Sequence, residues 1–255
     1  MNIRDKSLRA LLVQLLVSLK NFYTFKDLEQ ILGVPQHTLW KYTSLNMMPE
    51  EQTAKRIFDK ILSTKTVERI VMNQLNLAGN DNKWIYLWNP ALMDLISFIV
   101  YRYFTKDAFD HILCFPEIAI PLGMSISRWY RKKLCVACNY SIFRSSNYII
   151  EFYLDKDRFP KMLYIPRNCI SKNGKILLVT DDILEGSILM SVNNIIKRIP
   201  AKIIGLITIE CSPTAYQFIK SNYHYPVLVV KDIVCLLYTS PSPRDLSTSR
   251  MPSSA

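Results

Sequence analysis

The chain has 255 residues, of which 49% are hydrophobic, and its formal net charge is +11. That length fits one medium α/β domain together with a small helical domain. The positive charge favours a polyanionic partner such as nucleic acid, although it says nothing about the fold. The apolar stretch at residues 11–19 is about half as long as a membrane span, so we expect no membrane partner.

The cysteines favour a reducing compartment. Five of the six precede residue 235 and lie mostly inside apolar runs, which suits buried thiols better than a disulfide framework. Cys135 and Cys138 have the spacing of a zinc or redox pair, but no second Cys or His pair lies at ligand spacing. We therefore predict a cytoplasmic protein without a metal site of its own.

Helical signals dominate the first part of the chain. Leucines recur on one face over residues 8–19, and Thr24 is placed to cap a second helix at 25–32. Gly33 is expected to end that helix in a left-handed conformation, before a third helix at about 35–43. Two short helices joined by a glycine turn form a helix-turn-helix. A fourth helix begins at Pro49, which completes a predicted helix-turn-helix domain over residues 1–65.

The third helix is the expected DNA-reading element of this unit. Its polar residues fall on the side opposite Leu39, and Gln and Lys can reach base edges or phosphates in a major groove. Helix-turn-helix units also serve as plain packing elements, so that alternative stays open. The candidate DNA-binding residues are Thr24, Gln36, His37, Thr38, Trp40 and Lys41.

The segment KILLVTDDILEGSIL at residues 175–189 carries the most specific pattern. Its apolar run predicts a strand buried on both faces of a parallel sheet, with Asp181 and Asp182 at the carboxyl end, where open α/β sheets bind ligands. After Gly186 and Ser187 the apolar residues recur at helical spacing, so the loop lies at a helix amino terminus that attracts phosphate. Vicinal carboxylates suit paired ribose hydroxyls.

This segment resembles the phosphoribosyl-pyrophosphate motif of type I phosphoribosyltransferases. The resemblance implies that the acidic pair holds the ribose hydroxyls and that the next loop wraps the 5-phosphate. FPEIAIPLG at residues 115–123 resembles the pyrophosphate loop of the same family. Mg²⁺ is implied only together with bound phosphoribosyl pyrophosphate. The ligand-binding candidates are Asp181, Asp182, Glu185, Gly186, Ser187, Glu117 and Ala119.

Several positions depart from the family pattern. Ala119 replaces the usual glycine of the pyrophosphate loop, and Asn139 lies where a cation is expected. The motif loop is one residue short, with Glu185 beside the position of a threonine and Ile188 replacing a hydroxyl donor. Each lost charge-assisted hydrogen bond is worth ~1.5–3 kcal/mol. We therefore predict a pocket that binds without turnover, and assign no catalytic residue.

Strands and helices alternate over the rest of the chain, which indicates an α/β fold with a mostly parallel sheet flanked by helices. We predict a helical connector at 66–87 and a phosphoribosyltransferase-like domain at 88–234. Residues 235–255 resemble translated sequencing adapter and are excluded from fold reasoning. Strands are expected at 111–115, 134–138, 147–154, 162–165, 202–210 and 227–230, and helices at 90–104 and 121–132.

A helix-turn-helix joined to such a domain resembles the purine repressors of Gram-positive bacteria and archaeal regulators related to orotate phosphoribosyltransferase. The resemblance implies a homodimeric transcriptional regulator that binds double-stranded DNA and senses phosphoribosyl pyrophosphate or a nucleotide. The alternative is an active phosphoribosyltransferase acting on orotate or a purine base, with the N-terminal helices used for dimerisation.

Overall fold

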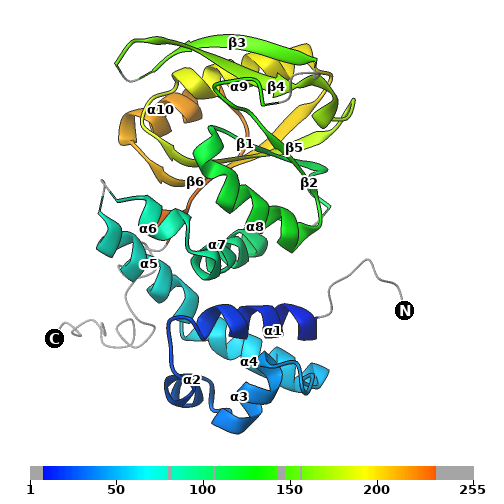
Figure 1. Cartoon of the computed structure of the whole chain (residues 1–255), viewed down its shortest axis with the longest axis vertical. Coiled ribbons are helices and arrows are strands. Elements are labelled where there is room, and N and C mark those ends of the chain that lie inside the picture. Colours follow the sequence, from blue (N-terminus) through cyan, green and yellow to red (C-terminus); the bar gives the residue numbers. More distant parts are fainter. Residues whose placement is uncertain (1–7, 80–81, 106, 143–146, 156, 234–255) are drawn as a thin grey trace, which may run out of the picture.

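The protein is elongated, with four N-terminal helices at one end and a β-sheet at the other (Figure 1). The computed structural model describes residues 8–79, 82–105, 107–142, 147–155 and 157–233. The predicted adapter tail at 235–255 lies outside the described residues. None of the described helices has the length and apolarity that crossing a bilayer requires.

The N-terminal helices lie where their sequence signals predict them. Thr24 caps the second helix, since its hydroxyl accepts a hydrogen bond from Asp27 N at 3.2 Å while the Asp27 carboxylate accepts one from Thr24 N at 2.8 Å. Gly33 ends the same helix at φ 67°, a left-handed conformation that glycine adopts without strain. The four helices are α1 (Leu8–Leu19), α2 (Phe25–Leu32), α3 (Gln36–Thr43) and α4 (Glu51–Ser63).

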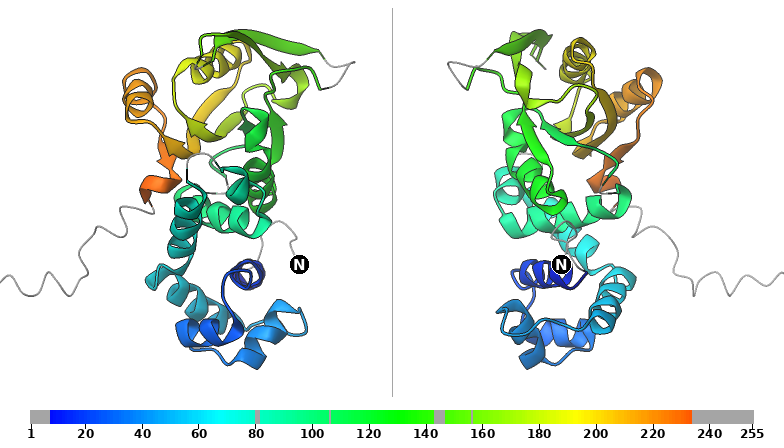
Figure 2. Two further views of the ribbon diagram at one scale, coloured as in Figure 1. Left: turned by 60° about the vertical axis from the view of Figure 1, so that its left-hand side comes forward. Right: turned by 90° about the vertical axis from the view of Figure 1, so that its right-hand side faces the viewer.

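Three helices join this end of the molecule to the sheet (Figure 2). Asp94, on the last of the three, accepts hydrogen bonds from Ser18 of α1 at 3.3 Å and Ser125 at 2.8 Å, and forms an ion pair with Arg128. Buried apolar side chains also form one continuous core from α1 to the sheet. The joining helices are α5 (Thr66–Ala78), α6 (Trp84–Leu87) and α7 (Pro90–Tyr103).

The central sheet has five parallel strands in the order β2-β1-β5-β6-β7. Its middle strand, β5, is buried along almost its whole length because helices cover both faces. The sequence predicts all five strands, although β5 and β6 are longer than expected. The strands are β1 (His111–Cys114), β2 (Lys133–Val136), β5 (Lys175–Ile183), β6 (Lys202–Cys211) and β7 (Val227–Val229).

Helices α7 and α8 (Ile120–Tyr130) contribute to the core on one face of the sheet, and α9 (Ser187–Arg198) and α10 (Pro213–Asn222) to the core on the other. Gly123 of α8 lies against β1, where an added Cβ would overlap the Cys114 sulfur. Helix α10 was not predicted. Its start signal is nevertheless present, because the Ser212 hydroxyl accepts a hydrogen bond from Ala215 N at 3.1 Å and Pro213 follows the cap.

Strands β3 (Tyr148–Leu154) and β4 (Pro160–Pro166) form a separate antiparallel hairpin. The sequence predicts both strands but not their separation from the parallel sheet. The hairpin packs on α9, whose side chains donate to carbonyl oxygens of β3. Ser187 donates to Leu154 O at 2.8 Å, and Ser191 donates to Phe152 O at 2.9 Å.

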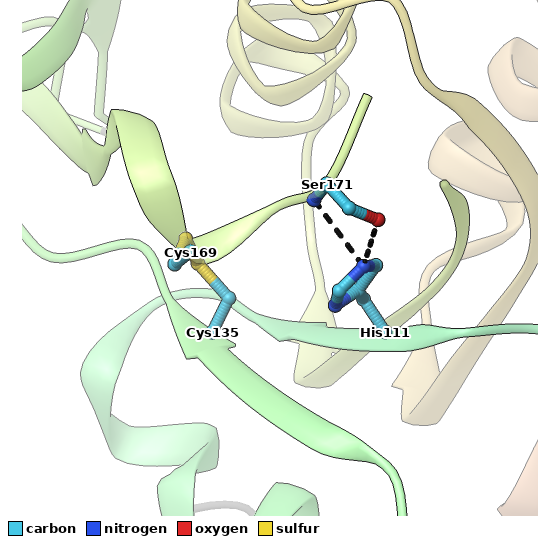
Figure 3. The surroundings of a disulfide bond; sticks show 4 residues. All are labelled: His111, Cys135, Cys169 and Ser171. Carbon is cyan, nitrogen blue, oxygen red and sulfur yellow. Dashed lines mark hydrogen bonds between the residues drawn. A yellow bond between two sulfur atoms is a disulfide. The ribbon is translucent and has the colours of Figure 1, made fainter. Parts of the chain in front are cut away.

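Two cysteines correct the expectation of free thiols. Cys135 of β2 and Cys169 form a disulfide, 34 residues apart in sequence (Figure 3). Cys169 ends the short helix η2 (Arg167–Cys169), which the fold brings against β2. Cys138 is a buried free thiol, as predicted. Nearby, His111 accepts a hydrogen bond from Ser171 N at 3.2 Å, and burial lowers the pKa of its imidazole.

Candidate functional site

Three carboxylates gather where β5 and β6 end. Asp181 and Asp182 are the seventh and eighth residues of β5, and Glu210 of β6 is paired in register with Asp182. The sequence placed the two aspartates after the strand, whereas β5 continues through them to Ile183. Because parallel strands end at the same edge, the carboxylates lie together at the ligand-binding edge expected for an open α/β sheet.

Two lysines form ion pairs with this cluster. Lys83, between α5 and α6, forms an ion pair with Asp182 Oδ2, and its Nζ is 3.9 Å from Asp181 Oδ2. Lys231, just after β7, pairs with Glu210 at 2.9 Å. Neither lysine was predicted from the sequence, because no motif links them to the carboxylates and Lys83 precedes Asp182 by 99 residues. Glu210 was also missed, although it lies at the end of a predicted apolar strand.

The site contains two buried polar atoms that lack a hydrogen-bond partner among the described residues. These are Asp181 Oδ1 and the hydroxyl of Tyr86 on α6, whose residues are 4% and 1% exposed. Burial raises the pKa of Asp181 to about 6, the negative charge of Asp182 adds to that rise, and Lys83 opposes it. Burial also raises the pKa of Tyr86, as do the nearby carboxylates, so its hydroxyl remains a neutral donor.

The predicted phosphate loop is used mainly by internal contacts. Gly186 has φ −78°, which any residue adopts, but an added Cβ would overlap the ring of Phe218 on α10. Its role is therefore close packing. Ser187 donates its hydroxyl to the Leu154 carbonyl of the hairpin. Glu185 is exposed to solvent. The predicted loop thus lies next to the acidic pair, but its glycine packs against Phe218 and its hydroxyl is hydrogen-bonded to the hairpin.

The predicted pyrophosphate loop forms the short helix η1 (Glu117–Ala119), which continues directly into α8. Glu117 accepts a hydrogen bond from Asn139 N at 3.3 Å, and the Asn139 side chain accepts one from Tyr153 at 2.6 Å. Ala119 is fully buried. The structure therefore brings Glu117 together with Asn139, the position where the family resemblance implies a cation.

The described side chains form no divalent-cation site of their own. No group of three or more His, Cys, Asp or Glu side chains in the described part of the chain converges on a point that would hold one. At Asp181 and Asp182 the Lys83 ammonium already contacts the carboxylates. Mg²⁺ prefers six oxygen ligands, and a lysine nitrogen supplies none.

The outer face of α3 is a second candidate site. Trp40 is 51% exposed, and Gln36, His37 and Lys41 are exposed as well. Gln36 donates a hydrogen bond to the Glu29 carboxylate of α2 at 2.7 Å, which links the two helices. Leu39 and Tyr42 are buried on the opposite side. Thr24 is occupied by its capping role, and Thr38 contacts His37 at 3.2 Å.

No family model and no curated protein matches the chain. Solved structures do match it. Adenine phosphoribosyltransferase of Saccharomyces cerevisiae matches with a TM-score of 0.50 and 14% identity, over 58% of this chain and 84% of its own. The Giardia lamblia enzyme, complexed with 9-deazaadenine, has a TM-score of 0.51 and 11% identity, over 56% and 81%.

The Leishmania donovani adenine phosphoribosyltransferase matches with a TM-score of 0.50 and 14% identity, over 64% of this chain and 79% of its own. At such low identity the likeness concerns the fold alone. The α/β part of the chain has a phosphoribosyltransferase-like fold, as the sequence motif predicts.

Proposed function

We propose that this protein is a DNA-binding transcriptional regulator whose phosphoribosyltransferase-like domain binds phosphoribosyl pyrophosphate or a nucleotide as effector. The observation that carries the proposal is that the acidic pair and the phosphate loop of the motif both make contacts with other groups of the chain. Lys83 pairs with Asp182, and Ser187 donates to a backbone carbonyl. A transferase needs cations and donors free to stabilise departing pyrophosphate, whereas a sensor needs only affinity.

The N-terminal helices support the DNA-binding half of the proposal. Helices α2 and α3 meet at Gly33, and α3 presents Gln36, Trp40 and Lys41 to solvent. Lys41 suits phosphate contact and Gln36 suits base contact. We further propose a homodimer, because paired recognition helices read half-sites about 34 Å apart. A cytoplasmic location is part of the same proposal and rests on the proposed DNA binding, since the Cys135–Cys169 disulfide does not support the argument from free thiols.

The second candidate function is an active phosphoribosyltransferase for orotate or a purine base. The phosphoribosyltransferase-like fold and the retained Asp181–Asp182 pair favour it. In that case the N-terminal helices would serve dimerisation.

One pair of assays separates the two functions. A mobility-shift assay on genomic DNA fragments, with and without phosphoribosyl pyrophosphate, should show DNA binding that the effector changes. Incubation with phosphoribosyl pyrophosphate and orotate, adenine, guanine, hypoxanthine or uracil should release little or no pyrophosphate. Release at ~1 per second or faster, together with no DNA binding, would establish the enzyme instead.

A further inference from the structure

The acidic pair near the end of β5 has an internal counter-ion on the segment that links α5 to α6. Lys83 Nζ contacts Asp182 Oδ2 and lies 3.9 Å from Asp181 Oδ2, so one ammonium group faces both carboxylates. The Lys83 and Asp182 side chains are only 20% and 22% exposed. Water therefore screens this ion pair less than it would screen a pair on the open surface.

A divalent cation would need the same oxygen atoms. Ligands that carry pyrophosphate commonly bring Mg²⁺, which binds one or two protein carboxylates together with the phosphates. Lys83 and Mg²⁺ are both positively charged and cannot share Asp182 Oδ2 without strong repulsion. A metal ion would therefore have to displace the lysine in order to bind Asp182 Oδ2.

The unpartnered buried atoms match a hydroxyl group better than a metal ion. Asp181 Oδ1 is an acceptor without a donor, and the Tyr86 hydroxyl is also unpartnered. A sugar hydroxyl both donates and accepts, so vicinal hydroxyls can satisfy the carboxylate and the phenol together. A metal ion can satisfy the carboxylate only.

We infer that Lys83 takes the place of a divalent cation at Asp181 and Asp182, so that the pocket receives a sugar phosphate with vicinal hydroxyls without Mg²⁺. The identity of the ligand rests on the proposed function. The role of Lys83 as counter-ion rests on the ion pair alone and is tested separately.

The first test titrates the full-length chain with Mn²⁺ alone, followed by electron paramagnetic resonance. The wild-type chain should show no saturable binding in the micromolar range. Lys83→Gln should gain a saturable Mn²⁺ site, with an affinity at least about tenfold higher than any binding by the wild-type chain. Adding Asp182→Asn to this variant should remove the site. The matched control is Lys161→Gln, which removes an exposed lysine from its ion pair with Asp155 in the hairpin and should gain nothing.

Two results would overturn the inference. One is Mn²⁺ binding by the wild-type chain as tight as by Lys83→Gln, which would show that the lysine and the metal coexist. The other is no gain in Lys83→Gln while its thermal melt and circular dichroism spectrum match the wild type. If Lys83→Gln does not fold, Lys83→Met keeps the side-chain volume without the charge and repeats the test.

The second test measures the affinity for ribose 5-phosphate by calorimetry, with Mg²⁺ or with EDTA. The wild-type affinity should agree within about twofold under both conditions, and only Lys83→Gln should bind more tightly with Mg²⁺. Wild-type binding that requires Mg²⁺ would contradict the inference. If neither chain binds ribose 5-phosphate, the proposed effector site fails, while the Mn²⁺ titration still decides the role of Lys83.

Discussion

The acidic cluster at the ends of β5 and β6 and the outer face of α3 differ in how far the chain itself uses their polar groups. In the cluster, Lys83 pairs with Asp182, Lys231 pairs with Glu210, and Asp181 is almost fully buried. On α3, Trp40 and Lys41 are exposed to solvent. Buried charges require partners inside the protein, whereas exposed ones are hydrated by water.

This difference defines two kinds of binding. A ligand that binds at the cluster would meet two buried polar atoms without a partner among the described residues, Asp181 Oδ1 and the Tyr86 hydroxyl, so its binding adds contacts inside the protein. A polyanion that meets α3 displaces mainly water and counter-ions. The acidic cluster therefore suits a sensor that alters the protein, and α3 suits direct recognition. Four predictions test this comparison.

The largest effect is expected from Asp181→Asn. The pKa of Asp181 is raised from 3.8 to about 6, so between these pH values the folded chain binds more protons than the unfolded chain. The free energy of unfolding should therefore fall as pH rises from about 4 to 6 and stay lower above pH 6. The rise in pKa corresponds to about 3 kcal/mol, so the substitution should stabilise the chain at pH 7.5 by up to that amount.

Urea unfolding at a series of pH values measures this prediction. Asp27→Asn is the contrasting variant from the helical end, because hydrogen bonds from Thr24 lower the pKa of Asp27. Asp27 stabilises the chain above its unfolded pKa, and that stability is lost as pH falls through the folded pKa, so its substitution should destabilise the chain at neutral pH. Equal pH profiles for both variants would remove the distinction between the two regions.

The second prediction concerns the glycine of the motif. Gly186→Ala should lower the free energy of unfolding by about 1–3 kcal/mol, because the new methyl group overlaps Phe218. In the Phe218→Ala background the same substitution should cost much less, as double-mutant unfolding curves would show. An unchanged stability with a lost affinity for ribose 5-phosphate would instead make Gly186 a phosphate-binding glycine.

The third prediction tests α3. Lys41→Ala should weaken binding to all DNA sequences alike and lower the salt dependence by about one ion. Gln36→Ala should relax base preference by ~1–3 kcal/mol. Mobility shifts at several salt concentrations measure both, with the exposed Lys220→Ala on α10 as control. Unchanged affinity in both α3 variants would move the N-terminal helices to a dimerisation role.

The smallest effect is expected from Ser187→Ala. The substitution removes the hydrogen bond to the Leu154 carbonyl, which should cost about 0.5–1.5 kcal/mol of stability. Ser191→Ala removes the similar bond to Phe152 and should cost about as much, although Ser191 lies outside the motif. A loss of ligand affinity in Ser187→Ala but not in Ser191→Ala would instead show that the Ser187 hydroxyl binds the phosphate.

Much of the fold was predictable because its signals are local. Thr24 begins α2 because its hydroxyl caps the helix, and Gly33 ends α2 because it adopts a left-handed conformation. The parallel strands followed from apolar runs between helices. Helix α10 was missed because its sequence has a weak apolar pattern, even though Ser212 and Pro213 mark its start.

The rest depended on contacts between residues distant in sequence. The Cys135–Cys169 disulfide joins cysteines that are 34 residues apart, and no local pattern links them. The separate β3–β4 hairpin has no local signal either, since several strand pairings satisfy the same alternating pattern. Gly186 and Ser187 also have other roles than predicted, because Phe218 lies against the glycine and the Leu154 carbonyl accepts a hydrogen bond from the serine.

Residue order and apolar spacing are enough to predict two adjacent carboxylates near the carboxyl end of a buried strand and before a helix, because these features govern local structure. The pairing of Lys83 with Asp182 and the burial of Tyr86 in the same site come from the packing of distant segments. The physical reason is that burial requires charges to find partners wherever the fold supplies them. A motif therefore names the groups of a site, and the packing around it decides which of them are free to bind.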